Sequence, residues 1–240
     1  MRYGTMLVLL LLPAPAALAD VALAYGDAAQ QPTYTLSIQG DRLRMETHDD
    51  AGSVVLFDAA KREMTVVDGG RREYLVVDEA AIARIQEQMK QALAMAAQFG
   101  LSPEKLGLGD VQERAEAVEV KTGETKTVAG FECELVRYEI DGVVDGTACV
   151  AEPGELGVAA DDWRGMQSMF EMLMSMAADI VPVELGSMNL APPEGIAVEA
   201  RNADGSDAQV LKSVDDAPID ASMFEIPAGY KAIEIPSLGG

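Results

Sequence analysis

The sequence predicts an α+β protein, mainly β, in which an antiparallel sheet carries amphipathic helices on one face. Three observations lead to this class. Short segments between residues 33 and 77 alternate polar and apolar residues with the two-residue period of strands. Turn residues divide those segments from one another. Two apolar stripes with helical spacing, within residues 78–99 and 166–176, interrupt the strand pattern.

The N-terminus has the features of a secretory signal peptide. Arg2 precedes an apolar run at residues 6–12, and small residues end the segment at Ala19. That run is shorter than the roughly 20 apolar residues that span a bilayer. We therefore expect residues 1–19 to be removed, which leaves residues 20–240 as a single, periplasmic domain that does not span a membrane. A second cleavage site, after Ala24, stays open.

An antiparallel meander is expected before residue 78. In the segment RLRMETH, Leu43, Met45 and Thr47 alternate with charged residues, so one face of the sheet is polar and the other is packed. The predicted strands are YTLSIQ, RLRMETH, SVVLFD, EMTVVD and REYLVVD.

The first helix is expected to begin after Asp78, which caps it, and to run to about Phe99. Gly100 is the predicted stop. One apolar stripe follows the helix, and its residues are Ile82, Ile85, Met89, Leu93, Ala96 and Phe99.

The chain is expected to return to strands after a loop at residues 101–110. The predicted strands are AVEVKT, TKTVAG, a cysteine-containing hairpin, GIAVEARN and DAQVLKSVD. A short turn and an extended tail end the chain. The sequence has neither an internal repeat nor a low-complexity linker, which favours one continuous domain.

Cys133 and Cys149 are the only cysteines, and a disulfide is the expected state in an exported chain. If residues 140–142 form a three-residue loop with Gly142 in the left-handed conformation, Cys133 lies directly opposite Cys149. The alternative is a redox-active pair, but the CxxC spacing that lowers a thiol pKa is missing.

Composition and motifs exclude several functions. The formal net charge is −22, so nucleic acid and anionic membrane surfaces are poor partners. A Gly-x-Ser-x-Gly motif is lacking, and the only histidine, His48, is expected in an exposed turn. No carboxylate pair stands out among the 40 acidic residues. The sequence therefore predicts a protein that is not an enzyme and has no cofactor.

Four segments together resemble a known family. They are YTLSIQGDRLRMET, MTVVDGGRREYLVV, VAGFECELVRYEIDGVVDGTACVAEPGELG and MFEIPAGYKAI. The resemblance is to a domain of unknown function in bacterial periplasmic proteins, which is similar to the lipoprotein-carrier fold of LolA and LolB. It covers roughly residues 25–233. It implies an incomplete antiparallel β-barrel whose concave face is covered by two helices, which act as a lid over acyl chains.

The segment Met166–Met176 contains five of the thirteen methionines. As a helix it is apolar over about 200° of its circumference, wider than the stripe of an ordinary surface helix. Two interpretations are a flexible filling of the core and a lid over a lipid or other hydrophobic small molecule. The candidate lid residues are Met166, Met169, Phe170, Leu173 and Met176.

Copper is a third interpretation of the same helix. Met169, Met172 and Met176 share one flank, and three thioethers suit Cu(I). We expect non-enzymatic binding of a hydrophobic ligand and no metal site. The alternatives are a structural or interaction protein of the cell envelope with a self-filled core, and a Cu(I)-binding periplasmic protein.

Overall fold

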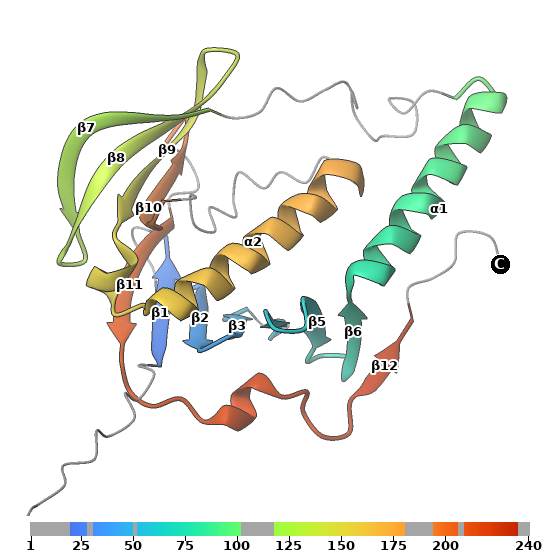
Figure 1. Ribbon diagram of the computed structural model, residues 1–240, viewed down its shortest axis with the longest axis horizontal. Helices are drawn as coiled ribbons and strands as arrows, with labels where there is room; N and C mark the ends of the chain where they lie inside the picture. The colour runs from blue at the N-terminus through green and yellow to red at the C-terminus, as the bar shows by residue number, and fades with distance from the viewer. Residues whose placement is uncertain are drawn as a thin grey trace, which may run out of the picture.

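The computed structural model describes residues 20–27, 31–49, 52–101, 118–180, 194–205 and 209–234. The predicted signal peptide, residues 1–19, lies outside the described residues. Within the described ranges the chain forms a 12-stranded sheet and two α-helices, so the α+β, mainly β class is confirmed. The helices lie on one side of strands β1–β6, and we call this side the helix face (Figure 1).

The first half of the chain contains six strands and one helix. They are β1 (Val21–Gly26), β2 (Tyr34–Gln39), β3 (Arg42–Thr47), β4 (Val54–Asp58), β5 (Glu63–Asp68), β6 (Glu73–Val77) and α1 (Glu79–Gln98). The second half contains β7 (Val118–Val128), β8 (Phe131–Ile140), β9 (Val143–Ala151), α2 (Ala160–Ile180), β10 (Ile196–Asn202), β11 (Gln209–Asp215) and β12 (Lys231–Ile233).

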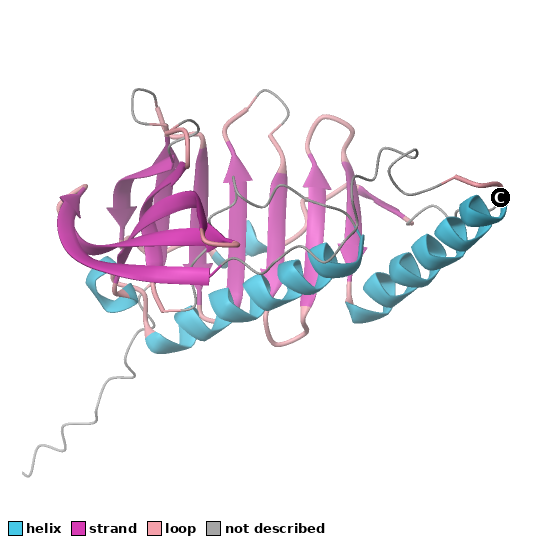
Figure 2. Cartoon of the chain, turned by 90° about the horizontal axis from the view of Figure 1, so that it is seen from above, coloured by secondary structure: helices cyan, strands magenta, loops and turns pink. Residues whose placement is uncertain are grey.

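The strand order is β12-β6-β5-β4-β3-β2-β1-β11-β10-β9-β8-β7. Every pairing among these strands is antiparallel except that of β12 with β6. The sheet is open, with β12 at one edge and β7 at the other. It curves so that β7–β10 rise beside α2 while β1–β6 pass beneath it (Figures 1 and 2).

Strand β1 was not predicted. Its residues are mostly small, and they follow the apolar leader closely enough to look like part of it. In the structure β1 pairs with both β2 and β11, and it therefore joins the two halves of the sheet. Val21 and Leu23 are 1% and 0% exposed, because the alternation of the strand turns both into the core.

The two strands predicted after residue 116 form one long strand, β7. Its pairing with β8 shifts register between Lys121 and Thr125, where Gly123 adopts a left-handed conformation with φ of 73°. A bulge of this kind bends a strand without ending it. The turn residues that suggested two strands therefore mark a bend.

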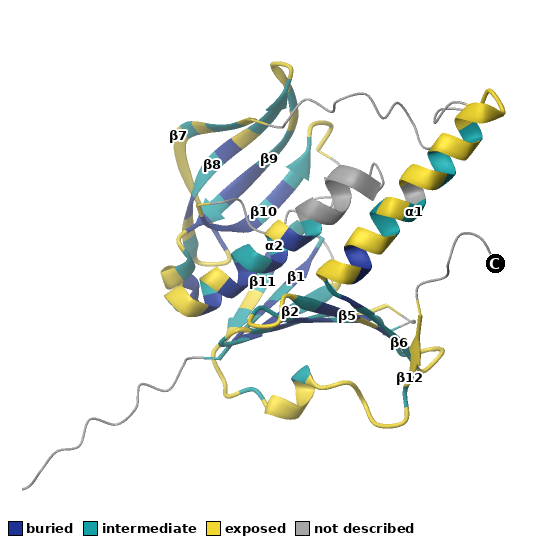
Figure 3. Cartoon of the chain, turned by 45° about the vertical axis from the view of Figure 1, so that its right-hand side comes forward, coloured by how far each residue is buried: buried dark blue, intermediate teal, exposed yellow. Residues whose placement is uncertain are grey.

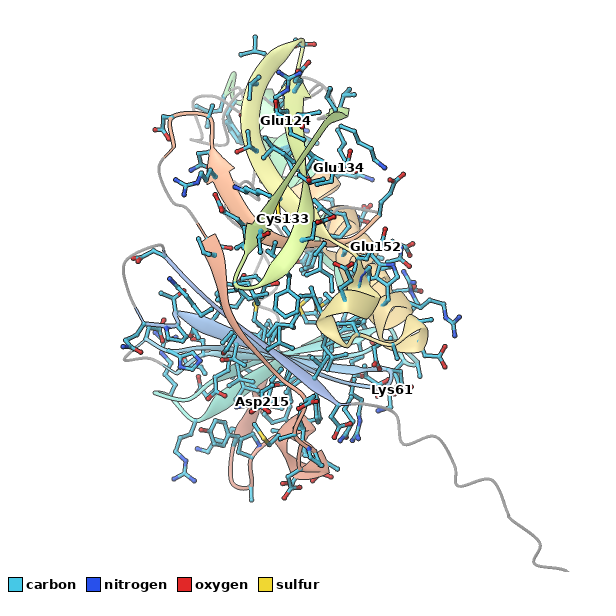
Figure 4. All side chains as sticks on the ribbon, turned by 90° about the vertical axis from the view of Figure 1, so that its left-hand side faces the viewer. Lys61, Glu124, Cys133, Glu134, Glu152 and Asp215 are labelled. Carbon is cyan, nitrogen blue, oxygen red and sulfur yellow. A yellow bond between two sulfur atoms is a disulfide. The ribbon has the colours of Figure 1, made fainter. Side chains whose placement is uncertain are left out.

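The cysteine hairpin differs from the predicted register. Its turn contains two residues, Asp141 and Gly142, both with positive φ, in place of the expected three. The pairing of β8 with β9 also shifts register between Tyr138 and Glu139. As a result Leu135, and not Cys133, lies directly opposite Cys149. The disulfide between Cys133 and Cys149 is nevertheless formed, across a diagonal with a Cα–Cα distance of 5.3 Å. Figure 4 labels Cys133 on the curved part of the sheet.

The predicted limits of the first helix are confirmed. The Asp78 side chain accepts a hydrogen bond of 2.7 Å from the backbone N–H of Ala81, and the backbone N–H of Phe99 closes the last turn. Among the described side chains of α1, only those of the first turn, Ala81 and Ile82, are buried. Farther along, α1 leaves the sheet and extends away from β6 (Figures 1 and 2).

Residues 216–234, here called the C-terminal strap, cross the face of β2–β6 that is opposite the helices (Figures 1 and 3). Tyr230 packs on a second apolar cluster formed by Val54, Leu56 and Val67. The strap ends in β12, which pairs with the edge of β6. The sequence predicted an extended tail here but gave no sign of this parallel pairing.

Removing the disulfide tests its contribution to stability. We expect the double variant Cys133→Ala/Cys149→Ala to lose about 3 kcal/mol of unfolding free energy, because the bridge restricts a short loop of the unfolded chain. Urea denaturation followed by fluorescence of Trp163, the only tryptophan, measures the loss. An unchanged midpoint would show that the strands alone hold this hairpin.

Candidate functional site

Methionines of α2 form the centre of the core. Met166, Met169 and Met172 are 3%, 4% and 1% exposed and belong to the main apolar cluster. Their partners come from both halves of the sheet, including Leu23 and Ile196. Unbranched side chains fill the irregular space between a curved sheet and a straight helix.

The other predicted lid residues flank this buried row. Phe170 is half-buried, and Leu173 is half-buried and packs against the main cluster. Met176 belongs to α2, but its side chain lies outside the described residues. The ligand-binding role of all five residues stays a prediction.

The first turns of α2 lie close to the sheet. A Cβ atom at Gly165 would lie 3.5 Å from both the carbonyl oxygen of Gly40 and a methyl of Leu43, which is van der Waals contact distance, so this turn of the helix lies directly on the sheet. The neighbouring Asp162 is 0% exposed. Trp163 packs against the main cluster. The start of α2 is therefore tightly seated.

Two parallel rows of apolar side chains cross the helix face of β3–β6. The row nearest the start of α2 is closed: Leu43, Phe57, Met64 and Val77 are at most 5% exposed. The next row along the strands is open by comparison. Val66 is 39% exposed, and its neighbours in the row are half-buried. Those neighbours are Met45, Val55 and Leu75. We call this second set the open row.

The apolar stripe of α1 also becomes more exposed along its length. In the stripe, Ile82 is buried and Leu93 is half-buried, whereas Phe99 is 76% exposed; Met95, beside the stripe, is 61% exposed. Figure 3 shows the buried base of the helix and its exposed tip. Residues 91–101 carry no charge, although charged residues make up 24% of the chain. Exposed apolar side chains thus occur both on the open row and at the far end of α1.

Arg62 connects both helices to the turn between β4 and β5. Its Nε lies 2.6 Å from a carboxylate oxygen of Glu79 in α1, and its Nη1 lies 3.9 Å from one of Glu171 in α2. The three side chains are 44% to 70% exposed, so solvent screens these ion pairs and they add little stability. Their effect is to orient the helices.

The helix face becomes charged at β7 and β10. Glu199 accepts a hydrogen bond of 2.7 Å from Arg201, and its other oxygen lies 3.0 Å from Nζ of Lys126. Burial raises the pKa of Glu199, but the two cations outweigh that effect and hold the pKa below its usual range.

A groove of about 190 Å³ opens near the β7 edge and is strongly acidic. Among the described residues that line it, Lys121 is the only cation. Burial raises the pKa of Glu119, and the charges of Glu194 and Glu134 add to that rise. The carboxylates that line the groove are Glu119, Glu132, Glu134, Glu152, Glu155 and Glu194. Figure 4 labels Glu134 and Glu152.

Nothing in the described part of the chain groups three or more His, Cys, Asp or Glu side chains in an arrangement suited to a metal ion. Likewise, neither α1 nor α2, over the residues described, is long and apolar enough to cross a membrane.

No protein-family model and no curated protein matches the chain. Among solved structures, it is similar to PNGF-II in a C2 and in a P21 crystal form, with TM-scores of 0.41 and 0.45 and 10% sequence identity in both. The matches cover 91% and 90% of this chain but only 31% and 32% of PNGF-II. The chain thus spans about a third of those structures, and TM-scores this low support no inference about function.

The sequence predicted the apolar helix α2. It did not predict the exposure of the open row or the burial of Asp162. The alternation of EMTVVD does assign Met64 and Val66 to one face. It cannot show that α2 covers Met64 and leaves Val66 exposed, because that depends on where the helix crosses the strands. Asp162 follows directly on Asp161, and nothing in that sequence indicates that its side chain is buried.

Substitution of the α2 methionines separates packing from metal binding. We expect Met172→Ala to cost about 2–5 kcal/mol because it leaves a cavity in the core. Met172→Leu keeps the volume and should cost less than about 1.5 kcal/mol. Urea denaturation followed by Trp163 fluorescence distinguishes the two.

The triple variant Met169→Leu/Met172→Leu/Met176→Leu tests the copper interpretation. Any Cu(I) bound through thioethers is lost in this variant, whereas the apolar character of the helix is kept. Retention of Cu(I) affinity by the triple variant, measured by competition with a chromophoric chelator, would rule out these methionines as ligands.

Proposed function

We propose that this protein is an exported, non-enzymatic binder of a hydrophobic ligand, which lies along the open row between the sheet and its two helices. The supporting observation is the contrast between adjacent rows of one sheet face. The first row is sealed by α2, while Val66 in the second is 39% exposed. An apolar chain placed there removes surface from water on both partners, at about 0.8 kcal/mol per buried CH₂.

The shape of the sheet supports a LolA-like half-barrel as the frame for this site. The sheet is curved, has two unjoined edges, and holds α2 within its curvature (Figure 1). From the resemblance to the LolA family we take only the binding of an apolar ligand. Carriers of that family use an arginine inside the cavity, whereas Arg42 and Arg44 contact the C-terminal strap on the opposite face. Transport of lipoproteins is therefore not part of the proposal.

Export to the periplasm is the localisation that we propose. The disulfide between Cys133 and Cys149 suits an oxidising compartment. The formal net charge of −22 makes an uncharged or zwitterionic ligand more favourable than an anionic one. The absence of enzymatic activity is proposed with the same function and stays a prediction.

A structural or interaction protein with a self-filled core is the second candidate. It is favoured by the burial of Met166, Met169 and Met172, which fill the space beneath α2 with the chain's own side chains. The two candidates differ in what happens at the open row. A ligand binder accepts an apolar molecule there, whereas an interaction protein does not.

Binding of the uncharged dye N-phenyl-1-naphthylamine tests the proposal. We expect saturable binding with enhanced dye fluorescence, and a loss of at least about tenfold in affinity in Val66→Lys, because a charge in an apolar site must be desolvated. Val143→Lys is the matched control, since Val143 is 70% exposed at the start of β9, away from the open row. Equal loss of affinity in both variants, or no saturable binding, would contradict the proposal.

A further inference from the structure

Asp162 is a buried carboxyl group at the start of α2. Its side chain is 0% exposed, and Oδ2 accepts a hydrogen bond of 3.3 Å from the backbone N–H of Ala159. Oδ1 is also buried and makes no hydrogen bond of good geometry among the residues described, although the peptide N–H of Gly40 is near enough to the carboxyl group to lower its pKa. A buried polar atom of this kind calls for an explanation, because its lost hydration is not replaced.

The neighbouring carboxylates further disfavour the ionised form of Asp162. Burial raises the pKa of the Asp162 carboxyl, and the carboxylates of Asp161 and Asp20 raise it further, while the peptide groups of Ala159 and Gly40 oppose the rise. Two cations of the adjoining segments already have carboxylate partners. Arg164 pairs with Asp161, and Lys61 pairs with Asp58.

Asp20 stands directly before β1, at the end of the sheet where α2 begins. Val21 pairs with Ile38, so Asp20 lies beside Gln39 and next to the Gly40 turn. The same turn contacts the first turns of α2 at Gly165. Figures 1 and 2 both show the start of β1 beside the start of α2.

Asp20 is also held firmly in place. Its Oδ2 accepts a hydrogen bond of 3.0 Å from the side-chain amide of Gln39 and one of 2.7 Å from the backbone N–H of Ile219. The Asp20 carboxylate is near enough to Asp162 to raise the pKa of that carboxyl group, so these two hydrogen bonds fix Asp20 in the neighbourhood of the buried group.

Signal cleavage after Ala19 changes the chemistry of that nitrogen. Water adds across the Ala19–Asp20 peptide bond, Ala19 leaves with a carboxylate, and Asp20 gains an amine that takes up a proton, since α-amino groups have pKa values of about 7.7–8.0. The alternative cleavage after Ala24 would remove Val21 and Leu23, which are 1% and 0% exposed, and would destroy β1.

We propose that the α-ammonium group created at Asp20 by signal cleavage is the missing partner of Asp162 and locks the start of α2 onto the sheet. The inference rests on the proposed export. It makes processing the step that completes the core, since the uncleaved chain offers a neutral peptide nitrogen at this position. Removal of the leader would therefore stabilise the packing of α2 on the sheet, and this packing buries the first apolar row.

The test compares two chains, one beginning at Asp20 and one that retains Leu18 and Ala19 and so moves the charge two residues away. Each is made with Asp162 and with Asp162→Asn. At pH 7 we expect the unfolding equilibrium constant of the Asp20 chain to be about tenfold smaller than that of the extended chain, equivalent to one pKa unit of preferential interaction. When both chains carry Asp162→Asn, they should unfold alike.

The pH dependence has a defined sign. Pairing raises the pKa of the α-amino group in the folded state, so the extra stability is complete below its unfolded value and disappears as pH rises through the folded value. NMR titration of the Asp20 α-amino group in the unsubstituted chain measures this directly, and it serves even if Asp162→Asn does not fold. An ordinary α-amino pKa, or an equal advantage of the Asp20 chain when Asp162→Asn is present, would overturn the inference.

N-terminal sequencing of the protein recovered from a periplasm separates the two proposals. A first residue other than Asp20 overturns the processing step and this inference with it. A first residue of Asp20 combined with no coupling to Asp162 overturns this inference alone and leaves export standing.

Discussion

The contact between α2 and the curved sheet is the constraint on which the rest of the molecule depends. Strands alternate their side chains, so the helix face of β1–β6 carries rows of apolar residues that must be covered. A single helix covers one row of it. The methionines of α2 adapt to the curvature of the sheet and seal that row, with Met172 only 1% exposed. The open row has the same cause, because α2 crosses the strands over the first row and not over the second.

Two turns of similar sequence connect the sheet to the helices on one face and to the C-terminal strap on the other. The sequences DAAKRE and DGGRRE connect β4 to β5 and β5 to β6, and in each the aspartate accepts a hydrogen bond from a backbone N–H three residues on. Each turn also places an arginine in the left-handed conformation. Arg62 then reaches both helices, while Arg72 lies over the ring of Tyr230 in the strap. One local motif thus orients the cover on each face of the sheet.

Local patterns in the sequence were sufficient for the meander, the Asp78 cap and the disulfide, because each depends on residues close in the chain or on a single pair. The failures were non-local. Strand β1 is defined by partners near residues 36 and 213, and β12 by a parallel contact with β6. The hairpin register failed because Asp141 adopts a positive φ that its sequence permits but does not require. For the site, the sequence identified the apolar face of α2 but not the level at which that helix crosses the sheet.

Native mass spectrometry of the protein, purified without detergent from a periplasm, tests the central claim most directly. If the open row binds a hydrophobic ligand, part of the population will carry a lipid-sized mass that is lost on mild collisional activation, above a polypeptide mass two hydrogens light for the disulfide. A polypeptide mass with no adduct, from cells that contain ample lipid, would contradict ligand binding and favour an interaction protein with a self-filled core.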